Sequence, residues 1–475
     1  MIFSTYRFIF AFLPITFFGY FLLNRLKYQS LGKIWLVLCS LYFYAQGSPS
    51  FFPFFLGSIT GNYLVGTKLI NLEGAQKTQK KWLLAIGILG NVGLLGYYKY
   101  TDFFIENWNA LTGSDVALKH IVLPIGISFF TFQLIAYLVD CYRSEMGQYD
   151  FVNYLLFITF FPQLIVGPII HHAEVVPQFE DANNLKLNFD HLALGLFLFS
   201  VGCAKKILLA DPMTSNAEQF FNAVPENAPL LQTWFCSIEY TISYYFDLSG
   251  YADMAIGLGM MFNICIPHNF DSPYKARNFQ DYWRRWHMTL SRFLSAYIFR
   301  SVYKKDTPWR NYYVATMVTF FVSGFWHGAG WTFVVWGLVN GVLVCIASWM
   351  KRRDLSLPAA LAFPLTWFGV VVCRVLFVSK SFGDAAKVYR GMFNFASLGS
   401  TFSQWIGTIA TFVSRRHMIG LRLVIGIVIC WFLPNSKYMQ EHFKASRKSL
   451  VFAAVLLFGC LINMNKVVQF LYFQF

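Results

Sequence analysis

The chain has 475 residues, of which 56% are hydrophobic, 20% aromatic and only 13% charged. A soluble globular protein carries roughly 25% charged residues, so this composition excludes an ordinary soluble enzyme. The net charge of +15 comes without a basic tail or an RNA-binding signature, so we expect contact with anionic lipid headgroups and not with nucleic acid. The many apolar runs predict an all-α, polytopic transmembrane helical bundle of about 11–14 membrane segments, some of them re-entrant.

The first apolar run, Met1–Leu23, has no small-residue cleavage site, so we interpret it as a membrane helix and not as a signal peptide. Counting the following runs places the basic loop at 77–81 and Arg143 on one side. The loop with Asp102, Glu106 and Asp115 then falls on the other. The positive-inside rule therefore predicts an N-terminus outside the cytoplasm. The apolar runs between these loops are predicted membrane segments at 32–46, 51–70, 82–98 and 120–140.

Small residues recur every third position in the fourth run, at Gly87, Gly90, Gly93 and Gly96. This spacing places them on neighbouring positions of one helix, where small side chains let a second helix approach. We therefore expect close helix packing along this run.

The segment Phe151–Ile170 contains Pro162, Gly167 and Pro168, which interrupt helical hydrogen bonding at membrane depth. We therefore predict a broken or re-entrant helix. The pair His171-His172 follows it. Adjacent histidines point in different directions on a helix and no carboxylate cluster accompanies them, so we interpret the pair as solvated and interfacial and predict no metal site.

The second half of the chain continues the pattern of apolar runs separated by basic segments. We expect Lys205 and Lys206 to extend toward a membrane surface, and the strongly basic stretch 271–310 to be cytoplasmic. Nine scattered cysteines without a CxxC pair indicate buried free thiols. Further spans are predicted at 190–210, 228–247, 250–266, 358–378, 417–434 and 450–465, with a hairpin at 311–350 and an amphipathic helix at 383–395.

Two histidines are the candidates for chemistry. His327 stands in a Trp326-His-Gly step between two apolar runs, and a buried imidazole can act as a general base. The alternative is a packed histidine that a neighbouring carbonyl satisfies. His287 follows a basic segment, and helical spacing places it on one face with Trp283 and Ser291.

Charged groups surround His287. Arg284 and Arg285 suit an anionic ligand such as a phosphate or carboxylate, but a basic helix lying on lipid headgroups explains them equally well. Asp247 and Asp253 stand in an apolar helix, where each could orient a histidine or form a structural ion pair. The sequence contains no GxSxG, P-loop, GxGxxG or HExxH motif, so residue chemistry alone leaves enzyme and transporter both open.

Several long motifs in order resemble the membrane-bound O-acyltransferases, closest to the alginate O-acetyltransferase branch. They are NFDSPYKARNFQDYWRRWHMTLS, GFWHGAGWTFVVWGLVNG, FFPQLIVGPI, YYFDLSGYADMAIGLG and the terminal FLYFQF. The resemblance covers most of the chain. It implies one integrated domain over 1–475, built around a central tunnel in the bacterial cytoplasmic membrane.

The resemblance also implies an activity: acyl transfer from a cytoplasmic thioester donor to a hydroxyl of a polysaccharide or peptidoglycan. His327 matches the principal catalytic histidine of the family and His287 the second. The groups that would bind the substrate are Trp283, Arg284, Arg285, Trp286, Trp326, Asp247 and Asp253. No bound cofactor is implied, only acetyl-CoA or an acyl-carrier thioester as donor substrate. The implied partner is a separate extracytoplasmic acetyltransferase of the serine-nucleophile type.

One segment departs from the family pattern. After the Thr-Leu-Ser step the family continues with an acidic residue and a glycine-rich loop, whereas this chain reads RFLSAYIFRSVYKKDTPWR. The segment 293–310 is expected to border the cytoplasmic entrance. The donor is therefore the least determined part of the prediction, and a D-alanyl exporter fed by a carrier protein remains an alternative.

Overall fold

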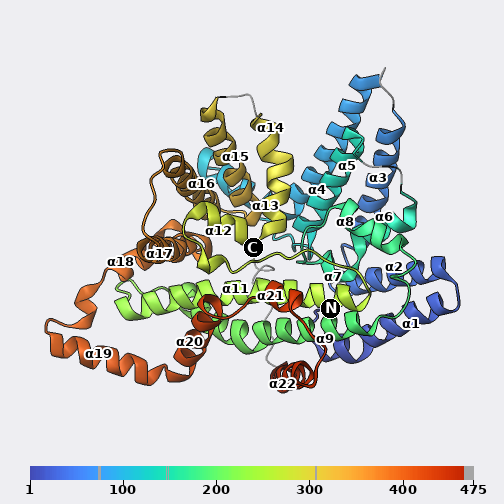
Figure 1. Cartoon of the computed structure of the whole chain (residues 1–475). Helices are drawn as coiled ribbons and strands as arrows, with labels where there is room; N and C mark the ends of the chain where they lie inside the picture. The colour runs from blue at the N-terminus through green and yellow to red at the C-terminus, as the bar shows by residue number, and fades with distance from the viewer. Residues whose placement is uncertain (73–75, 146, 148, 305–307, 465–475) are drawn as a thin grey trace. The chain divides into compact units, whose positions relative to one another are not determined.

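The computed structural model describes residues 1–72, 76–145, 147, 149–304 and 308–464, and these residues form helices and loops without a β-strand (Figure 1). The prediction of an all-α fold is confirmed. The chain divides into two compact units, each assembled from three separate stretches. The first comprises 1–201, 251–268 and 444–455, and the second comprises 202–250, 269–443 and 456–475. Whether the chain acts as one integrated domain stays a prediction.

The first unit contains the N-terminal helices. Phenylalanine side chains from the apolar faces of its helices form much of its core. Phe8 and Phe161, for example, pack with ring centroids 6.1 Å apart. The elements are η1 (Phe8–Phe12), α1 (Leu13–Arg25), α2 (Gln29–Ala45), α3 (Phe52–Asn71), α4 (Lys77–Thr112), α5 (Ile127–Arg143), α6 (Phe151–Thr159), α7 (Phe161–Leu164), α8 (His172–Glu180) and most of α9 (Phe189–Ala204).

Helix α4 corrects the predicted acidic loop. It continues to Thr112, so Asp102 and Glu106 lie on the helix and only Asp115 lies in a loop. The carboxylate of Asp102 accepts hydrogen bonds from the backbone N–H groups of Lys119 (2.7 Å) and His120 (2.8 Å). It thereby fixes the loop that returns to α5. The side of the membrane on which this loop lies stays a prediction.

The broken helix is present where the sequence predicted it. Helix α6 ends at Thr159, the short α7 ends at Leu164, and the chain then runs irregularly to α8. A Cβ on Gly167 would lie 2.3 Å from the Cα of Gln163, so only glycine fits this return of the backbone.

The second unit contains the C-terminal helices. Its elements are η3 (Lys205–Ala210), α10 (Asp211–Asn222), η4 (Pro273–Lys275), α12 (Phe279–Arg285), α13 (Met288–Leu294), η5 (Ser295–Phe299), α14 (Arg300–Val302), α15 (Trp309–His327), α16 (Trp331–Arg352), α17 (Ala359–Val378), α18 (Phe382–Met392), η6 (Phe395–Leu398), α19 (Phe402–Arg415), α20 (His417–Trp431) and α21 (Ser436–Glu441). The predicted hairpin is α15 with α16, and the predicted amphipathic helix is α18.

Besides α9, two helices contribute residues to both units. Helix α11 runs without interruption from Leu230 to Met261, and α22 covers Arg447–Asn463. The prediction of two spans at 228–247 and 250–266 is therefore wrong, because Gly250 remains helical. A Cβ on Gly250 would lie 2.8 Å from the carbonyl oxygen of Gly202, so this glycine permits close backbone packing and does not end the helix.

Glycines also bring α15 and α16 together, and the two helices lie side by side in Figure 1. A Cβ on Gly324 would lie 2.5 Å from the carbonyl oxygen of Phe333, and one on Gly337 would lie 2.4 Å from that of Phe320. Each glycine therefore faces backbone of the other helix at a distance that no side chain allows. This contact holds the end of α15, where His327 lies, against α16.

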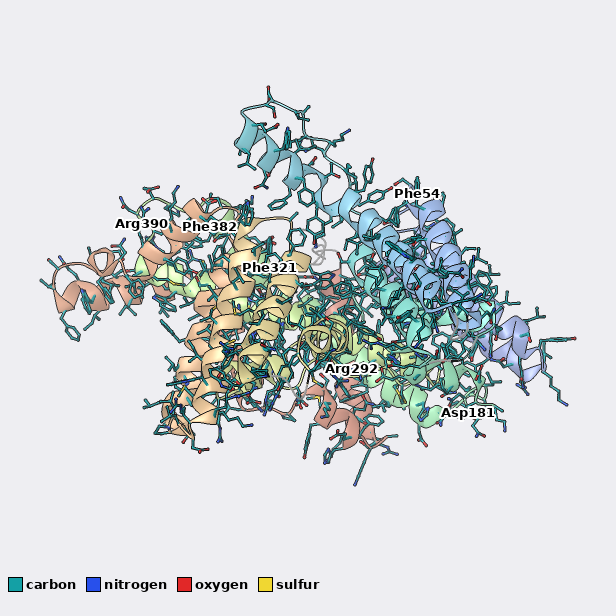
Figure 2. All side chains as sticks on the ribbon, turned by 90° about the horizontal axis from the view of Figure 1, so that it is seen from above. Phe54, Asp181, Arg292, Phe321, Phe382 and Arg390 are labelled. Atoms are coloured by element: carbon teal, nitrogen blue, oxygen red, sulfur yellow. The ribbon has the colours of Figure 1, made fainter. Side chains whose placement is uncertain are left out.

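Four helical segments of the described chain are long and apolar enough to span a membrane: 8–25, 189–222, 331–352 and 359–378. The larger number of segments predicted from the sequence stays a prediction. Large apolar side chains cover outer faces of the helices, among them Phe54 on α3 and Phe321 on α15 (Figure 2). All nine cysteines are described and none forms a disulfide; six are buried, but Cys265 is exposed.

Candidate functional site

His327 is the last residue of α15 and lies in a buried aromatic cluster of the second unit. Its ring meets those of Trp326, Trp336 and Phe377, with centroids 4.9, 5.1 and 5.5 Å apart. The helix ends here because Gly328 is extended. The space beside Gly328 is not open, since a Cβ there would lie 2.2 Å from the ring of Phe333.

His287 does not lie on a continuous helix, which corrects the predicted face with Trp283 and Ser291. Helix α12 ends at Arg285, and His287 has left-handed backbone angles (φ 46°, ψ 54°) immediately before α13. Asn269 stabilises this break: its carbonyl oxygen accepts from Met288 N–H (2.8 Å), and its side-chain oxygen accepts from Thr289 N–H (3.2 Å). Left-handed angles are uncommon for a residue with a side chain and are concentrated at functional sites.

The two histidines belong to one cluster. The ring of Trp326 contacts His327 and also lies 6.5 Å from that of His287, centroid to centroid. Both imidazoles are buried. Burial lowers the pKa of His287 to about 3, so this imidazole is neutral at neutral pH. The structure therefore brings together the two residues that the sequence singled out, although they are 40 positions apart.

Trp283 and Arg284 line a pocket of 290 Å³ next to this cluster. The indole N–H of Trp283 donates to Asn340 Oδ1 (3.3 Å), and its ring packs against Trp336, which in turn contacts His327. The pocket also reaches Ser323, one helical turn before His327. Arg284 is exposed at the same wall. The pocket thus leads from a cation toward the histidine cluster.

The segment that departs from the family pattern contributes to the same pocket. Its residues Leu294, Ser295 and Phe299, from the end of α13 and from η5, line the wall. Residues 305–307 of the segment lie outside the described part of the chain. The described part of this segment therefore lines the pocket, and its position at a cytoplasmic entrance stays a prediction.

Arg285 and Trp286 have mainly structural contacts. Arg285 Nε donates to Asp281 Oδ1 (2.9 Å) and its Nη1 donates to the carbonyl oxygen of Asp271 (3.3 Å), so this guanidinium fastens α12. Trp286 is buried and packs against Phe270 and Tyr244, with centroids 5.1 and 5.8 Å apart. Of the two adjacent arginines, Arg284 is the better placed to meet a substrate.

Asp247 forms a buried ionic cluster. Lys206 Nζ lies 2.5 Å from Asp247 Oδ1 and 2.7 Å from Asp211 Oδ1. The prediction that Lys206 extends to a membrane surface is wrong, because its side chain is 1% exposed. From the sequence, Asp247 could either form an ion pair or contact the substrate. In the structure it forms an ion pair with Lys206. Asp253 is buried in the part of α11 that belongs to the first unit, so its role at the histidines stays untested.

The histidine pair of the first unit has a different environment from the one predicted. His172 is buried, and Asp140 accompanies the pair: His171 Nε2 lies 2.9 Å and His172 Nε2 3.5 Å from Asp140 Oδ2. The interpretation as a solvated pair is therefore wrong for His172. These three ligand atoms lie within 4.8 Å of one another, as a metal site requires.

The hydrogen bonds around this pair favour a network without a metal. Ala173 N–H approaches His171 Nδ1 (3.4 Å), which places the proton of His171 on Nε2, where it faces Asp140. A metal would need the lone pair of that same Nε2. His172 Nδ1 lies 2.9 Å from the hydroxyl of Tyr149. The absence of a metal stays a prediction.

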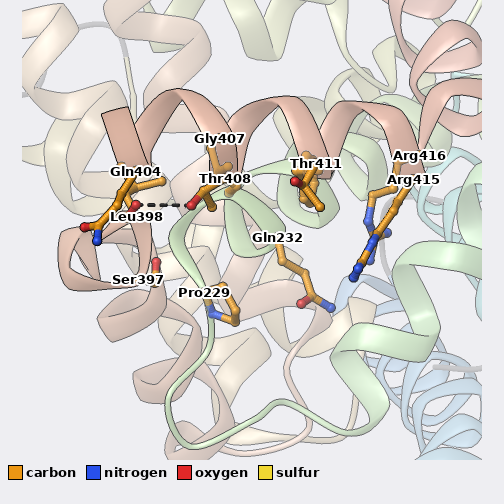
Figure 3. Close-up of a pocket in the computed structure, with 12 residues that line it drawn as sticks. Pro229, Gln232, Ser397, Leu398, Gln404, Gly407, Thr408, Thr411, Arg415 and Arg416 are labelled. Carbon is orange, nitrogen blue, oxygen red and sulfur yellow. Dashed lines mark hydrogen bonds between the residues drawn. The ribbon is translucent and has the colours of Figure 1, made fainter. Parts of the chain in front are cut away.

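The structure also contains a larger pocket, of 550 Å³, lined by η6, α19 and the start of α11 (Figure 3). Gln404, Thr408 and Thr411 face it, and Arg415 with Arg416 lies at one end. None of the candidate residues predicted from the sequence lines it. The pocket lined by Trp283 and Arg284 is smaller, but it lies beside the histidine cluster.

Comparison with known proteins identifies the family of this chain. The model of MBOAT, the membrane-bound O-acyltransferase family, matches residues 68–382, a range that contains both histidines. A peptidoglycan O-acetyltransferase of Helicobacter pylori is 37% identical, over 100% of this chain and 98% of that protein. A protein of Pseudomonas aeruginosa named "Probable alginate O-acetylase AlgI" is 33% identical over 84% of this chain and 76% of its own length.

A more distant relative is the teichoic acid D-alanyltransferase of Bacillus subtilis, 28% identical over 48% of this chain and 60% of that protein. A helical protein with membrane-spanning segments and a buried histidine cluster is thus matched along its length by acyl-transferring enzymes. The chain belongs to the membrane-bound O-acyltransferase family. It is an O-acyltransferase embedded in the bilayer with several membrane passes.

Proposed function

We propose that this protein moves an acetyl group from a cytoplasmic thioester donor toward hydroxyls of peptidoglycan outside the bacterial cytoplasmic membrane. The observation that carries the proposal is the contact of His287 and His327 with one indole ring, that of Trp326, beside the pocket lined by Arg284. Peptidoglycan is preferred over other polysaccharides because the relative of 37% identity, matched over the full chain, bears that substrate in its name.

His327 would act as the general base. A neutral imidazole takes the proton of the acceptor hydroxyl, whose oxygen attacks the thioester carbonyl carbon. When the tetrahedral intermediate collapses, the carbon–sulfur bond breaks and the thiolate recovers the proton from the imidazolium. The surrounding rings of Trp326, Trp336 and Phe377 exclude water and thereby limit hydrolysis of the donor.

His287 would position the donor. With a pKa of about 3 it remains neutral at neutral pH, so it cannot supply an imidazolium proton, but it can donate or accept one hydrogen bond. Its orientation is set by the backbone break before α13, which Asn269 stabilises. This division of roles leaves His327 as the residue that moves the proton.

The donor would enter by the pocket of Trp283 and Arg284. Its 290 Å³ suits a slender thioester arm, and an exposed guanidinium at the wall suits a phosphate that the arm carries. Acetyl-CoA and an acyl-carrier thioester both present this chemistry. The acceptor side would be served by a separate extracytoplasmic acetyltransferase with a serine nucleophile, with the N-terminus of this chain on that same side.

The test is acetyl transfer by the purified protein in lipid nanodiscs with radiolabelled acetyl-CoA. His327→Gln should lower thioester consumption by about 10²–10⁴-fold, the usual contribution of a general base. His417→Gln is the matched control because His417 is exposed on α20. Unchanged turnover in the His327 variant overturns its role. Turnover with a D-alanyl carrier thioester but not with acetyl-CoA overturns the choice of donor.

A further inference from the structure

Arg374 is a buried cation on α17, a helix apolar enough to span a membrane, and no motif of the sequence drew attention to it. The residue is 4% exposed. Among the described residues no carboxylate lies within ion-pair distance of its guanidinium. A charge buried without a counter-ion is costly, so such a group is read as functional by default.

Aromatic rings surround the charge. The Cζ atom of Arg374 lies 4.3 Å from the ring centroid of Tyr244, 5.0 Å from that of Phe377 and 5.2 Å from that of Trp286. Such contacts stabilise a desolvated guanidinium, but by less than the free-energy cost of burying one ion. The rings hold the guanidinium in place but do not replace a counter-charge.

Hydrogen-bond donors outnumber acceptors around Arg374. Within the described chain, its Nε and the hydroxyl of Tyr240 have no hydrogen-bond partner. The hydroxyls of Tyr244 and Tyr282 interact with the guanidinium. The guanidinium only donates, whereas each hydroxyl both donates and accepts. An excess of buried donors with no carboxylate facing it among the described residues indicates a place for an electron-rich oxygen from outside the protein.

This cluster adjoins the two histidines. The ring of Phe377 contacts Arg374 and also lies 5.5 Å from His327. Trp286, another ring that contacts the guanidinium, is the residue immediately before His287. The cation and both imidazoles therefore share neighbours within one unit of the fold.

We propose that Arg374 is a catalytic residue that binds the carbonyl oxygen of the thioester and stabilises the oxyanion formed from it. The proposal rests on the acyl transfer proposed above. As the acceptor oxygen bonds to the carbonyl carbon and its proton passes to His327, the carbonyl π electrons move to the oxygen held by Arg374. They return when the carbon–sulfur bond breaks. A fixed guanidinium in a water-excluded site favours this charge without reorganisation.

The test compares Arg374→Gln and Arg374→Lys with the wild type in the nanodisc assay. Arg374→Gln should lower kcat on the order of 10²–10³-fold, the loss seen when an oxyanion donor is removed, and should change KM much less than kcat. Arg374→Lys, which keeps the charge, should recover part of kcat. Arg416→Gln is the control, because Arg416 also stacks on rings, those of Phe412 and Phe235, but lines the other pocket.

A binding experiment separates a catalytic cation from one that only supports the fold. Ethyl-CoA, a thioether, matches acetyl-CoA but lacks the carbonyl oxygen. The wild type should bind acetyl-CoA more tightly than ethyl-CoA, and Arg374→Gln should remove that preference. Equal loss of both ligands, or a normal kcat in a folded Arg374→Gln protein, overturns the proposal. No acetyl turnover by the wild type would instead overturn the proposed function itself.

Discussion

His287 and His327 contact the same indole, that of Trp326, from two different helical segments. Because one rigid ring touches both imidazoles, a change at Trp326 alters the position of both at once. His327 ends a helix, whereas His287 stands between two helices. The two histidines are therefore held by different means, and substitutions near each should have different effects.

The stability of the protein should depend on pH through His287. Its folded-state pKa of about 3 lies below the unfolded value of about 6.5, so below pH 6.5 the unfolded chain binds a proton that the folded protein does not. The free energy of unfolding should therefore fall as the pH falls from about 6.5 toward 3. His287→Asn should weaken this dependence, since asparagine tolerates left-handed angles but does not titrate.

The measurement is the thermal unfolding midpoint of both proteins between pH 7.5 and pH 5. As the pH is lowered, the unfolding midpoint of the wild type should fall more than that of His287→Asn. Parallel pH profiles would contradict the assignment of His287 as a buried neutral imidazole.

The contact of α15 with α16 should not tolerate a methyl group. Gly324→Ala places a Cβ against the carbonyl oxygen of Phe333, and forcing extra volume into a packed interface costs about 1–3 kcal/mol. Because His327 is one turn further along α15, acetyl transfer should fall together with the unfolding midpoint. Gly90→Ala on α4 is the control, since a Cβ there meets nothing within 4 Å. An unchanged unfolding midpoint and unchanged acetyl transfer in Gly324→Ala would contradict the close contact of the two helices.

The glycines of α4 also correct part of the sequence interpretation. Of the four at regular spacing, only Gly87 has a close neighbour, with a Cβ 2.7 Å from Leu138 Cδ1. A Cβ on Gly90, Gly93 or Gly96 would face open space. Regular spacing of small residues therefore does not by itself show that a second helix lies there.

The ionic cluster of Lys206 should be required for folding but not for binding substrate. Lys206→Met leaves the carboxylates of Asp211 and Asp247 without that ammonium, and breaking a buried pair in this way costs about 3–5 kcal/mol. The triple variant Lys206→Met, Asp211→Asn, Asp247→Asn should lose less, because no unmatched charge remains. Denaturation in detergent compares the two. A greater loss in the triple variant would indicate a further role for the carboxylates.

Removal of metal ions should leave the first unit unchanged. The Nδ1 of His171 accepts from Ala173 N–H and its Nε2 faces Asp140, so a metal would have to displace the proton of Nε2. Dialysis against EDTA should not shift the unfolding midpoint, and added Zn²⁺ should not raise it. Asp140→Asn should lower it, because the carboxylate that accepts from His171 Nε2 is lost. A midpoint that rises with Zn²⁺ in the wild type but not in Asp140→Asn would establish a metal site instead.

Hydrophobic patterning predicted most helices well because a membrane helix needs an uninterrupted apolar run. The run predicted at 358–378 is α17 at 359–378. The same reasoning divided α11 at Gly250, since a glycine in sequence does not distinguish a helix end from a close backbone contact. Conversely, nothing local marks the helix break at His287, which depends on the hydrogen bonds of Asn269.

The candidate site could be predicted only in part for a similar reason. His287 and His327 stood out because polar residues are rare in this chain, and the structure brings them together. Arg374 did not stand out, since a single arginine within an apolar run resembles one that extends to the membrane surface. The role proposed for it follows from its burial without a facing carboxylate among the described residues, which is a property of the folded chain alone.

The π-helical turn η3 makes the register of the chain important between α9 and α10. Asp211 N–H donates to the carbonyl oxygen of Lys206, five residues earlier, and the carboxylate of Asp211 meets the ammonium of that same lysine. A π turn contains one residue more than an α turn. Deleting one residue of 207–210 would restore an ordinary α-helix with the lysine and the aspartate four positions apart, still on one face. An α-helix over the same residues without a deletion would instead turn the two charges about 140° apart, so the wider turn is what lets positions five apart form the ion pair.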